Sequence, residues 1–184
     1  MIKFTEIATR TERKLVQNLY NESIPKHEKI YFYPMWFKRK QKNMSFLNAY
    51  DGEKWVGYLF FSTTGDLIYI WLYATIDTKM TRECDQKVLD ALKTLYPNHR
   101  IGISIESENI GAENKEKSAT ELAFYLKKRF VETGYFTKEK ADSFKIMITG
   151  GKLGIEEFYD LNRASYPLIG KFFVDILKKQ IKKS

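Results

Sequence analysis

The stretch from Leu67 to Phe130 constrains the fold more than any other part of this 184-residue chain. Two of its segments, Leu67–Ile76 and Ile101–Glu106, are dense in β-branched and aromatic residues, and a helical pattern follows each of them. This alternation predicts a βαβα unit in which the two strands are parallel neighbours. In such units, ligands bind at the carboxyl ends of the strands, where loops lead into helices. We therefore expect any chemistry to lie near residues 73–76 and 104–106.

Further strands are predicted on both sides of this unit. Asp51-Gly52 between two strand-like runs is typical of a hairpin, and Thr11 is the predicted N-cap of the first helix. The predicted flanking elements are the strands Met1–Ile7, Ser45–Asp51, Trp55–Ser62, Val131–Phe136 and Phe144–Thr149, a loop at Lys138–Asp142, and the amphipathic helices Ile155–Ala164 and Leu168–Ile181. The fold class is therefore α/β (α+β), with a mixed, largely antiparallel twisted sheet around the parallel unit and helices on both faces. We expect one domain over residues 1–150 and a C-terminal helical extension over residues 151–184 packed on it.

Composition restricts the class of protein. Hydrophobic residues make up 43% of the chain and aromatic residues 15%, which excludes a disordered chain. No apolar run reaches the roughly 20 residues that a membrane span needs, and the N-terminus lacks the apolar core of a signal peptide. Cys84 is the single cysteine, so no internal disulfide is expected, and the cytoplasm is the predicted compartment.

The net charge of +8 leaves two interpretations open. Basic residues gather at Lys38–Lys42 and in the last helix, at Lys171, Lys178, Lys179, Lys182 and Lys183. They are explained either by solvated helix faces or by a polyanionic ligand such as a phosphorylated cofactor or a nucleic acid.

Three short segments and the order of the predicted elements resemble one known family. Ser23-Ile24-Pro25-x-x-Glu28 resembles a Phe-Pro-x-x-Glu segment of one of its bacterial branches. Leu67–Ala74 resembles the strand before a cofactor loop, and Phe124–Phe130 resembles a Phe-Tyr-x-x-x-Gly-Phe segment, with Arg129 in the place of its glycine. These motifs, and the element order over residues 1–150, resemble those of the GNAT acetyltransferases. The resemblance implies a GNAT-type fold and the transfer of an acetyl group from acetyl-CoA to a primary amine.

The resemblance also implies roles for individual residues. Tyr125 lies in the place of the tyrosine that protonates the departing CoA thiolate. A phenol suits this role because it stays protonated near neutral pH. Glu106 ends a predicted strand and is the candidate base, while Glu28 and Glu108 are candidates for holding the acceptor amine. Backbone groups of Tyr73, Ala74, Thr75 and Ile76 are expected to contact the pantetheine arm and the thioester carbonyl. The alternative interpretation of Tyr125 is a place in the apolar core. The alternative interpretation of the three acids is that they are ordinary solvated residues: Glu106, Glu108 and Glu28.

The expected pyrophosphate loop departs from the family pattern Arg/Gln-x-x-Gly-x-Gly/Ala. The matching stretch is Met80–Gln86, and the candidate cofactor-binding residues in it are Arg82, Glu83, Cys84, Asp85 and Gln86. Glu83 and Asp85 take the glycine places, where carboxylates repel phosphate and side chains hinder close backbone approach. The alternative is a helix with Thr81 as its N-cap, whose acidic first turn complements the helix dipole.

Three functions follow as hypotheses. The first is an N-acetyltransferase that uses acetyl-CoA and no metal, with direct attack by the amine of a small-molecule or peptide acceptor. The second is a GNAT-fold binding or regulatory protein that has lost acetyl-CoA binding. The third, and the least expected, is a nucleic-acid-binding protein. Neither nucleic acid nor a membrane is therefore among the expected partners. A homodimer is left open.

Overall fold

The structure is a computed structural model of the chain. It describes residues 1–24, 36–77, 82–107, 112–139, 142–165, 178 and 181–183. The chain forms two compact units. The first contains Met1–Ser62 and Ile70–Pro97, and the second contains Thr63–Tyr69 and Asn98–Ser184. Each unit is a sheet with helices.

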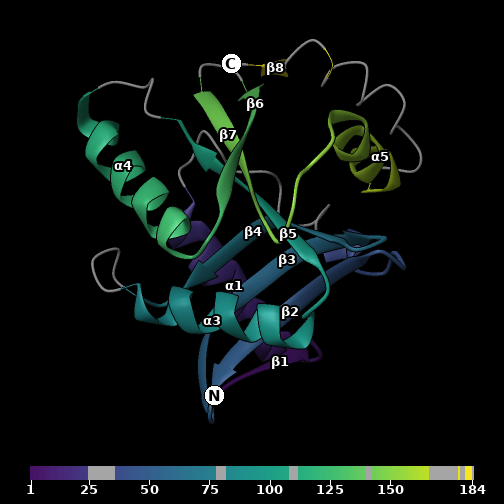
Figure 1. Ribbon diagram of the computed structural model, residues 1–184. Helices are drawn as coiled ribbons and strands as arrows, with labels where there is room; N and C mark the ends of the chain where they lie inside the picture. Colours follow the sequence, from purple (N-terminus) through teal and green to yellow (C-terminus); the bar gives the residue numbers. More distant parts are fainter. Residues whose placement is uncertain are drawn as a thin grey trace. The chain divides into compact units, whose positions relative to one another are not determined.

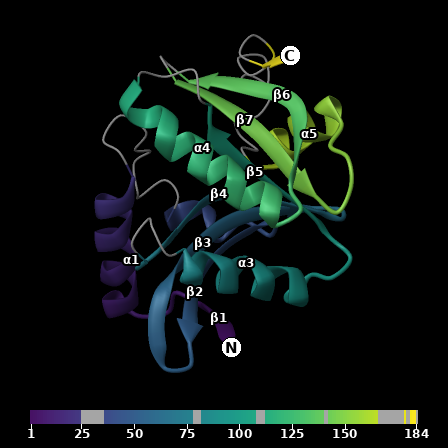
Figure 2. The ribbon, with the colours of Figure 1, turned by 60° about the vertical axis from the view of Figure 1, so that its left-hand side comes forward.

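The first unit contains the strands in the order β1 (Ile2–Glu6), β2 (Met44–Asp51), β3 (Lys54–Thr64) and β4 (Leu67–Thr75), of which β4 is shared with the second unit. β2 pairs antiparallel with both β1 and β3. The predicted hairpin between β2 and β3 is present, and Gly52 in its turn has a φ of 64°, which favours glycine. Helices α1 (Arg10–Ser23) and α3 (Glu83–Leu95) cover opposite faces of this sheet (Figures 1 and 2).

Helix α1 begins two residues earlier than predicted, because its N-cap is Thr9 and not Thr11. The Glu12 N–H donates to Thr9 Oγ1 over 3.1 Å, and the Thr9 N–H donates to Glu12 Oε2 over 2.8 Å. This reciprocal capping box satisfies two donors that the helix would otherwise leave unpaired. Hydrogen bonds from Thr9 accordingly lower the pKa of Glu12.

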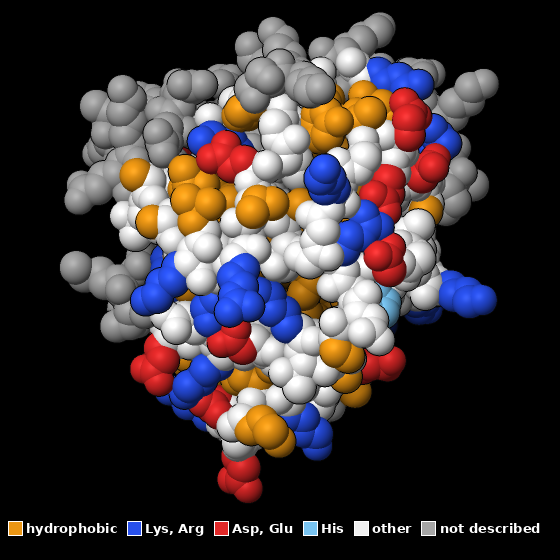
Figure 3. All heavy atoms as spheres, viewed as in Figure 1, with side chains coloured by type: hydrophobic (Ala, Val, Ile, Leu, Met, Phe, Trp, Pro, Cys, Tyr) orange, Lys and Arg blue, Asp and Glu red, His pale blue; other side chains and the backbone are white. Residues whose placement is uncertain are grey.

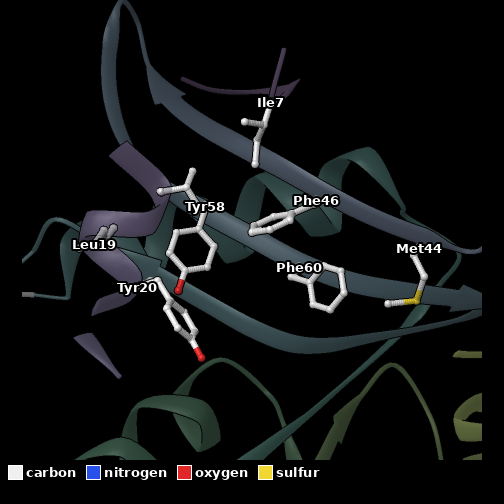
Figure 4. Close-up of a cluster of buried hydrophobic side chains, with 9 residues drawn as sticks. Ile7, Leu19, Tyr20, Met44, Phe46, Tyr58 and Phe60 are labelled. Carbon is white, nitrogen blue, oxygen red and sulfur yellow. The ribbon is translucent and has the colours of Figure 1, made fainter. Parts of the chain in front are cut away.

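The core under α1 is strongly aromatic (Figure 4). The Phe46 ring contacts the rings of Tyr58 and Phe60 at centroid distances of 5.8 and 5.2 Å. Tyr58 points toward Tyr20 of α1 in Figure 4. On the other face, α3 buries Val88, Leu89 and Leu92. The amphipathic patterns of both helices are thus satisfied by burial against one sheet.

The second unit contains, besides the start of β4, the strands in the order β5 (Arg100–Glu106), β7 (Asp142–Thr149), β6 (Val131–Glu139) and β8 (Lys182–Lys183). The β5–β7, β7–β6 and β6–β8 pairs are antiparallel. The predicted loop Lys138–Asp142 is wrong over most of its length, since Lys138 and Glu139 pair with Ser143 and Asp142 across the hairpin. Helices α4 (Ala112–Lys127) and α5 (Ile155–Ser165) cover opposite faces of this sheet (Figures 1 and 2).

One arginine connects several parts of the second unit. Arg100, at the start of β5, donates to both carboxylate oxygens of Asp66, to the Glu157 carboxylate of α5 and, over 2.6 Å, to the carbonyl oxygen of Lys152. A planar guanidinium can satisfy such a set of acceptors because its donors diverge in one plane.

The C-terminal part only partly matches its prediction. Helix α5 is present, whereas the predicted helix Leu168–Ile181 lies almost wholly outside the described residues. Lys182 and Lys183 form a strand that pairs with Phe136 and Tyr135, which their sequence did not predict. The predicted mixed α/β fold, largely antiparallel and with helices on both faces, is confirmed. None of the described helices combines the length and apolar character that a membrane crossing requires.

Candidate functional site

The expected pyrophosphate loop leads into α3, whose N-cap is Arg82 and not Thr81; Thr81 lies outside the described residues. Arg82 has a left-handed backbone, with φ 45° and ψ 24°, and its side chain makes no capping hydrogen bond. A left-handed conformation is costly for residues other than glycine. The first turn of α3 is therefore capped from elsewhere in the chain.

The cap is supplied by Asp77, which follows β4. Asp77 Oδ2 accepts a hydrogen bond from the backbone N–H of Cys84, in the first turn of the helix. Backbone donors at a helix N-terminus attract anions, and here a carboxylate of the chain itself holds one of them. Burial, followed by the contact with Asp77, raises the pKa of the Cys84 thiol to about 11, so the thiol stays protonated and unreactive at neutral pH.

A second carboxylate of the loop is also engaged. Asp85 Oδ1 accepts a hydrogen bond of 2.8 Å from the Thr75 hydroxyl at the end of β4. Burial raises the pKa of Asp85, although the Thr75 hydrogen bond and the charge of Arg82 act in the opposite direction. The structure therefore brings together Thr75, Arg82, Cys84 and Asp85, four of the residues that the sequence assigned to the cofactor, but Thr75 and Asp85 bind each other.

Glu83, the third acid, points into an exposed ion-pair network. Lys87 Nζ lies 3.2 Å from Glu83 and 2.8 Å from Asp51, and the N-terminal ammonium of Met1 lies 3.0 Å from Asp51. Lys87, and then the N-terminus, lower the pKa of Asp51 to about 2. On the face seen in Figure 3, basic and acidic side chains lie next to one another. Lys87 is paired in this way, because two carboxylates already neutralise it.

The backbone groups expected to contact pantetheine are partly committed. The Ile76 N–H donates to the carbonyl oxygen of Val56 over 2.9 Å, so this donor is used within the sheet. Ala74 is buried in the cluster under α1, and Tyr73 is half-buried. Gln86 is half-buried too, and its N–H donates to the Arg82 carbonyl oxygen within the helix. Their roles toward a cofactor stay predictions.

Glu106 and Tyr125 belong to the second unit. Glu106 ends β5 and is 7% exposed, which makes it the one buried carboxylate among the described residues. A buried carboxylate is costly unless it is paired, and such groups occur often at functional sites. The other two acids proposed from sequence, Glu28 and Glu108, lie outside the described residues.

Tyr125 is fully buried near the end of α4. Its ring contacts the rings of Phe124 and Phe130 at centroid distances of 5.2 and 5.3 Å. The Phe130 N–H donates to the Tyr125 carbonyl oxygen, and the Arg129 N–H donates to that of Leu126. With Arg129 at φ 64°, this is a Schellman motif. It explains why a glycine suits the place that Arg129 occupies.

Asp77 was not among the residues predicted from the sequence. A detectable hint is its position, as the acidic residue between the end of β4 and the first turn of α3. In the described part of the chain, no three His, Cys, Asp or Glu residues group closely enough to hold a metal ion.

Neither a protein-family model nor a curated protein matches this sequence. Solved structures do match. A putative GNAT-family acetyltransferase from Bacteroides thetaiotaomicron is 19% identical, with a TM-score of 0.68 over 94% of this chain and 98% of the other. The ribosomal-protein-S18-alanine N-acetyltransferase of Escherichia coli is 10% identical, with a TM-score of 0.61 over 85% and 97%.

A third match is an aminoglycoside 6'-N-acetyltransferase solved with coenzyme A. It is 10% identical, with a TM-score of 0.63 over 81% of this chain and 96% of the other. At such low sequence identities, a structural match shows a shared fold and not a shared activity. They confirm what the sequence motifs predicted: this chain has the fold of the GNAT acetyltransferases.

Proposed function

We propose that this protein is an acetyl-CoA-dependent N-acetyltransferase, which moves an acetyl group to a primary amine of a small-molecule or peptide acceptor by direct attack. The fold supports this proposal, because structures of the same fold include N-acetyltransferases, one of them solved with coenzyme A. The observation that carries it is the buried carboxylate of Glu106 at the carboxyl end of β5. A strand end is where α/β folds place ligands, and a general base is what an ammonium acceptor needs.

The proposed chemistry assigns one proton transfer to each of two residues. Glu106 takes the proton that the acceptor nitrogen must lose to attack the thioester carbon. Tyr125 donates its phenolic proton to the sulfur that leaves as the carbon–sulfur bond breaks. Both groups are buried, and exclusion of water strengthens their effect on the charges that develop.

The test is a thiol-release assay with acetyl-CoA and a panel of amines and peptides. Glu106→Gln and Tyr125→Phe are expected to lower kcat by about 100-fold or more with little change in the KM for acetyl-CoA, as general acid–base residues do. Glu132→Gln is the matched control, since Glu132 is an exposed acid of the same unit. Wild-type turnover in both site variants would remove the two residues from the mechanism. No turnover by the wild-type protein with any amine would contradict the proposed function.

A second function has one specific observation in its favour. The hydrogen bond from Cys84 to Asp77 and the engaged acids Glu83 and Asp85 make the first turn of α3 a poor place for a pyrophosphate. A GNAT-fold binding protein without acetyl-CoA is the function that this geometry favours. Isothermal titration calorimetry separates the two, because the second function requires no heat of binding at about millimolar acetyl-CoA.

A further inference from the structure

Two short stretches of the first unit are rich in cations that the proposed transfer reaction does not use. They are the start of α1 and the segment after Trp36, and we call their cations the basic patch: Arg10, Arg13, Lys14, Arg39, Lys40 and Lys42. None of the six has an acidic partner among the described residues, in contrast to Lys87, Arg100, Lys145 and Arg163. In residues 8–15 and 36–44 the one acid is Glu12, which the capping box engages.

Trp36 joins the two halves of the basic patch. The Arg39 guanidinium lies 3.8 Å from the centroid of the Trp36 ring, and that of Arg13 lies 5.6 Å from it. Arg39 Nη1 also donates to the Trp36 carbonyl oxygen over 2.8 Å. The Trp36 ring in turn contacts Phe46 of the core edge-on, at a centroid distance of 6.2 Å. Arg39 is therefore held in place by the core, and no other described residue accepts a hydrogen bond from its remaining guanidinium N–H groups.

An exposed aromatic residue belongs to the same short segment as Arg39, Lys40 and Lys42. Phe37 follows Trp36 directly, and 66% of its side chain is exposed. Exposure of a large aromatic ring is unfavourable in water, and exposed aromatic rings within basic segments are typical of surfaces that bind single-stranded nucleic acid. There, bases stack on the aromatic ring while Lys and Arg contact the phosphates.

We infer that the basic patch and Phe37 form a binding surface for single-stranded nucleic acid. A membrane is the less suitable partner, because binding at its interface requires a broad apolar face, whereas Phe37 is one ring among cations. Arginine forks match the geometry of phosphate oxygens, and two arginines of the patch already stack on Trp36. This inference does not depend on acetyl transfer.

The test is fluorescence anisotropy of a labelled single-stranded oligo-uridine with the full chain over a series of salt concentrations. We expect log K to fall linearly with log salt, with a slope of about −0.7 for each phosphate contact. Lys40→Ala with Lys42→Ala removes such contacts and is expected to reduce both the affinity and the slope. Phe37→Ala is expected to weaken binding about tenfold with an unchanged slope, because it removes stacking rather than charge.

The matched control is Lys3→Ala with Lys54→Ala, which removes two exposed cations of the same unit and changes the net charge equally. It is expected to change the affinity less than about twofold. Thermal melts check that every variant is folded. An equal loss in the control pair, or no binding at low salt, would overturn the inference. Stronger binding to anionic phosphatidylserine vesicles than to the oligonucleotide, lost in Phe37→Ala, would also overturn it and identify a membrane surface.

Discussion

The Tyr125 ring packs against Phe130, with the ring centroids 5.3 Å apart, and this contact accompanies the Schellman motif that ends α4. The motif requires a left-handed residue between helix and strand, and that residue is Arg129, with φ 64°. Arg129 is exposed and therefore contributes little packing. The position of Tyr125 is thus maintained at the cost of a strained arginine.

Arg129→Gly is expected to raise the free energy of unfolding by about 0.5–1 kcal/mol, because glycine adopts this conformation without strain, even after its greater freedom in the unfolded chain is counted. Urea denaturation measures it. The control is Ala123→Gly, an exposed position inside the same helix, where glycine is expected to cost about 1 kcal/mol. A loss of stability in both variants would contradict the role assigned to Arg129.

Asp77→Ala tests the cap of α3 in two ways. Loss of the acceptor for the Cys84 N–H is expected to lower the free energy of unfolding by about 1 kcal/mol. The freed donor and the lost negative charge are expected to tighten the binding of coenzyme A, which calorimetry measures. Glu83→Gln is the control, since it removes one negative charge from the first turn of α3 without freeing a backbone donor. Equal effects of both variants on affinity would mean that charge alone matters.

The C-terminal end of α4 and the N-terminal end of α3 show together what could be predicted from the sequence and what could not. The apolar patterns of α3 and α4 and the strands around them were sufficient for the fold, because burial of a periodic face is a local property of the sequence. The capping box of α1 could have been found too, since Thr9 and Glu12 have the required spacing. The bond from Cys84 to Asp77 could not, because it spans seven residues and depends on how the chain turns after β4. The β8 pairing of two lysines has no hydrophobic pattern at all.

Lys38 is expected to make stability depend on pH. Burial lowers its pKa from 10.5 to about 8. Between these values the unfolded chain keeps a proton that the folded chain has lost, so the contribution of Lys38 to stability rises with pH. Lys38→Met is therefore expected to stabilise the protein near pH 7, by about 1 kcal/mol for a half-buried group, and less near pH 10. Urea denaturation at both pH values measures this, with the exposed Lys40→Met as control. A gain that is equal at both pH values would contradict the shifted pKa.

Gly57 is where β3 approaches β4 too closely for a side chain. A Cβ atom there would lie 2.2 Å from the Ala74 carbonyl oxygen and 2.9 Å from the Thr75 Cα, both backbone atoms. Gly57→Ala is expected to lower the free energy of unfolding by about 3 kcal/mol, since the strands must separate. In the control, Gly52→Ala, the new methyl meets nothing within 4 Å, and only its φ of 64° is unfavourable. A melting temperature equally low in both would show that strand separation is not the cause.

Two buried tyrosines, each 1% exposed, are expected to respond oppositely to loss of the hydroxyl. The Tyr58 hydroxyl has no hydrogen-bond partner in the described part of the chain, whereas the Tyr69 hydroxyl lies 2.6 Å from Ser104 Oγ. Tyr58→Phe removes an unsatisfied polar group from the core under α1 and is expected to raise the free energy of unfolding by about 1 kcal/mol. Tyr69→Phe removes a formed bond and is expected to lower it by about 1–2 kcal/mol.

Denaturant unfolding of the two variants under one set of conditions gives this comparison, because both substitutions delete one oxygen atom and keep the ring. Burial raises the pKa of Tyr58, so its hydroxyl remains a protonated donor throughout the pH range in which the protein is studied. Ordered water can satisfy a buried hydroxyl, and then its removal is destabilising. A loss of stability in Tyr58→Phe comparable to that in Tyr69→Phe would therefore show that solvent or a ligand reaches the core between α1 and the sheet.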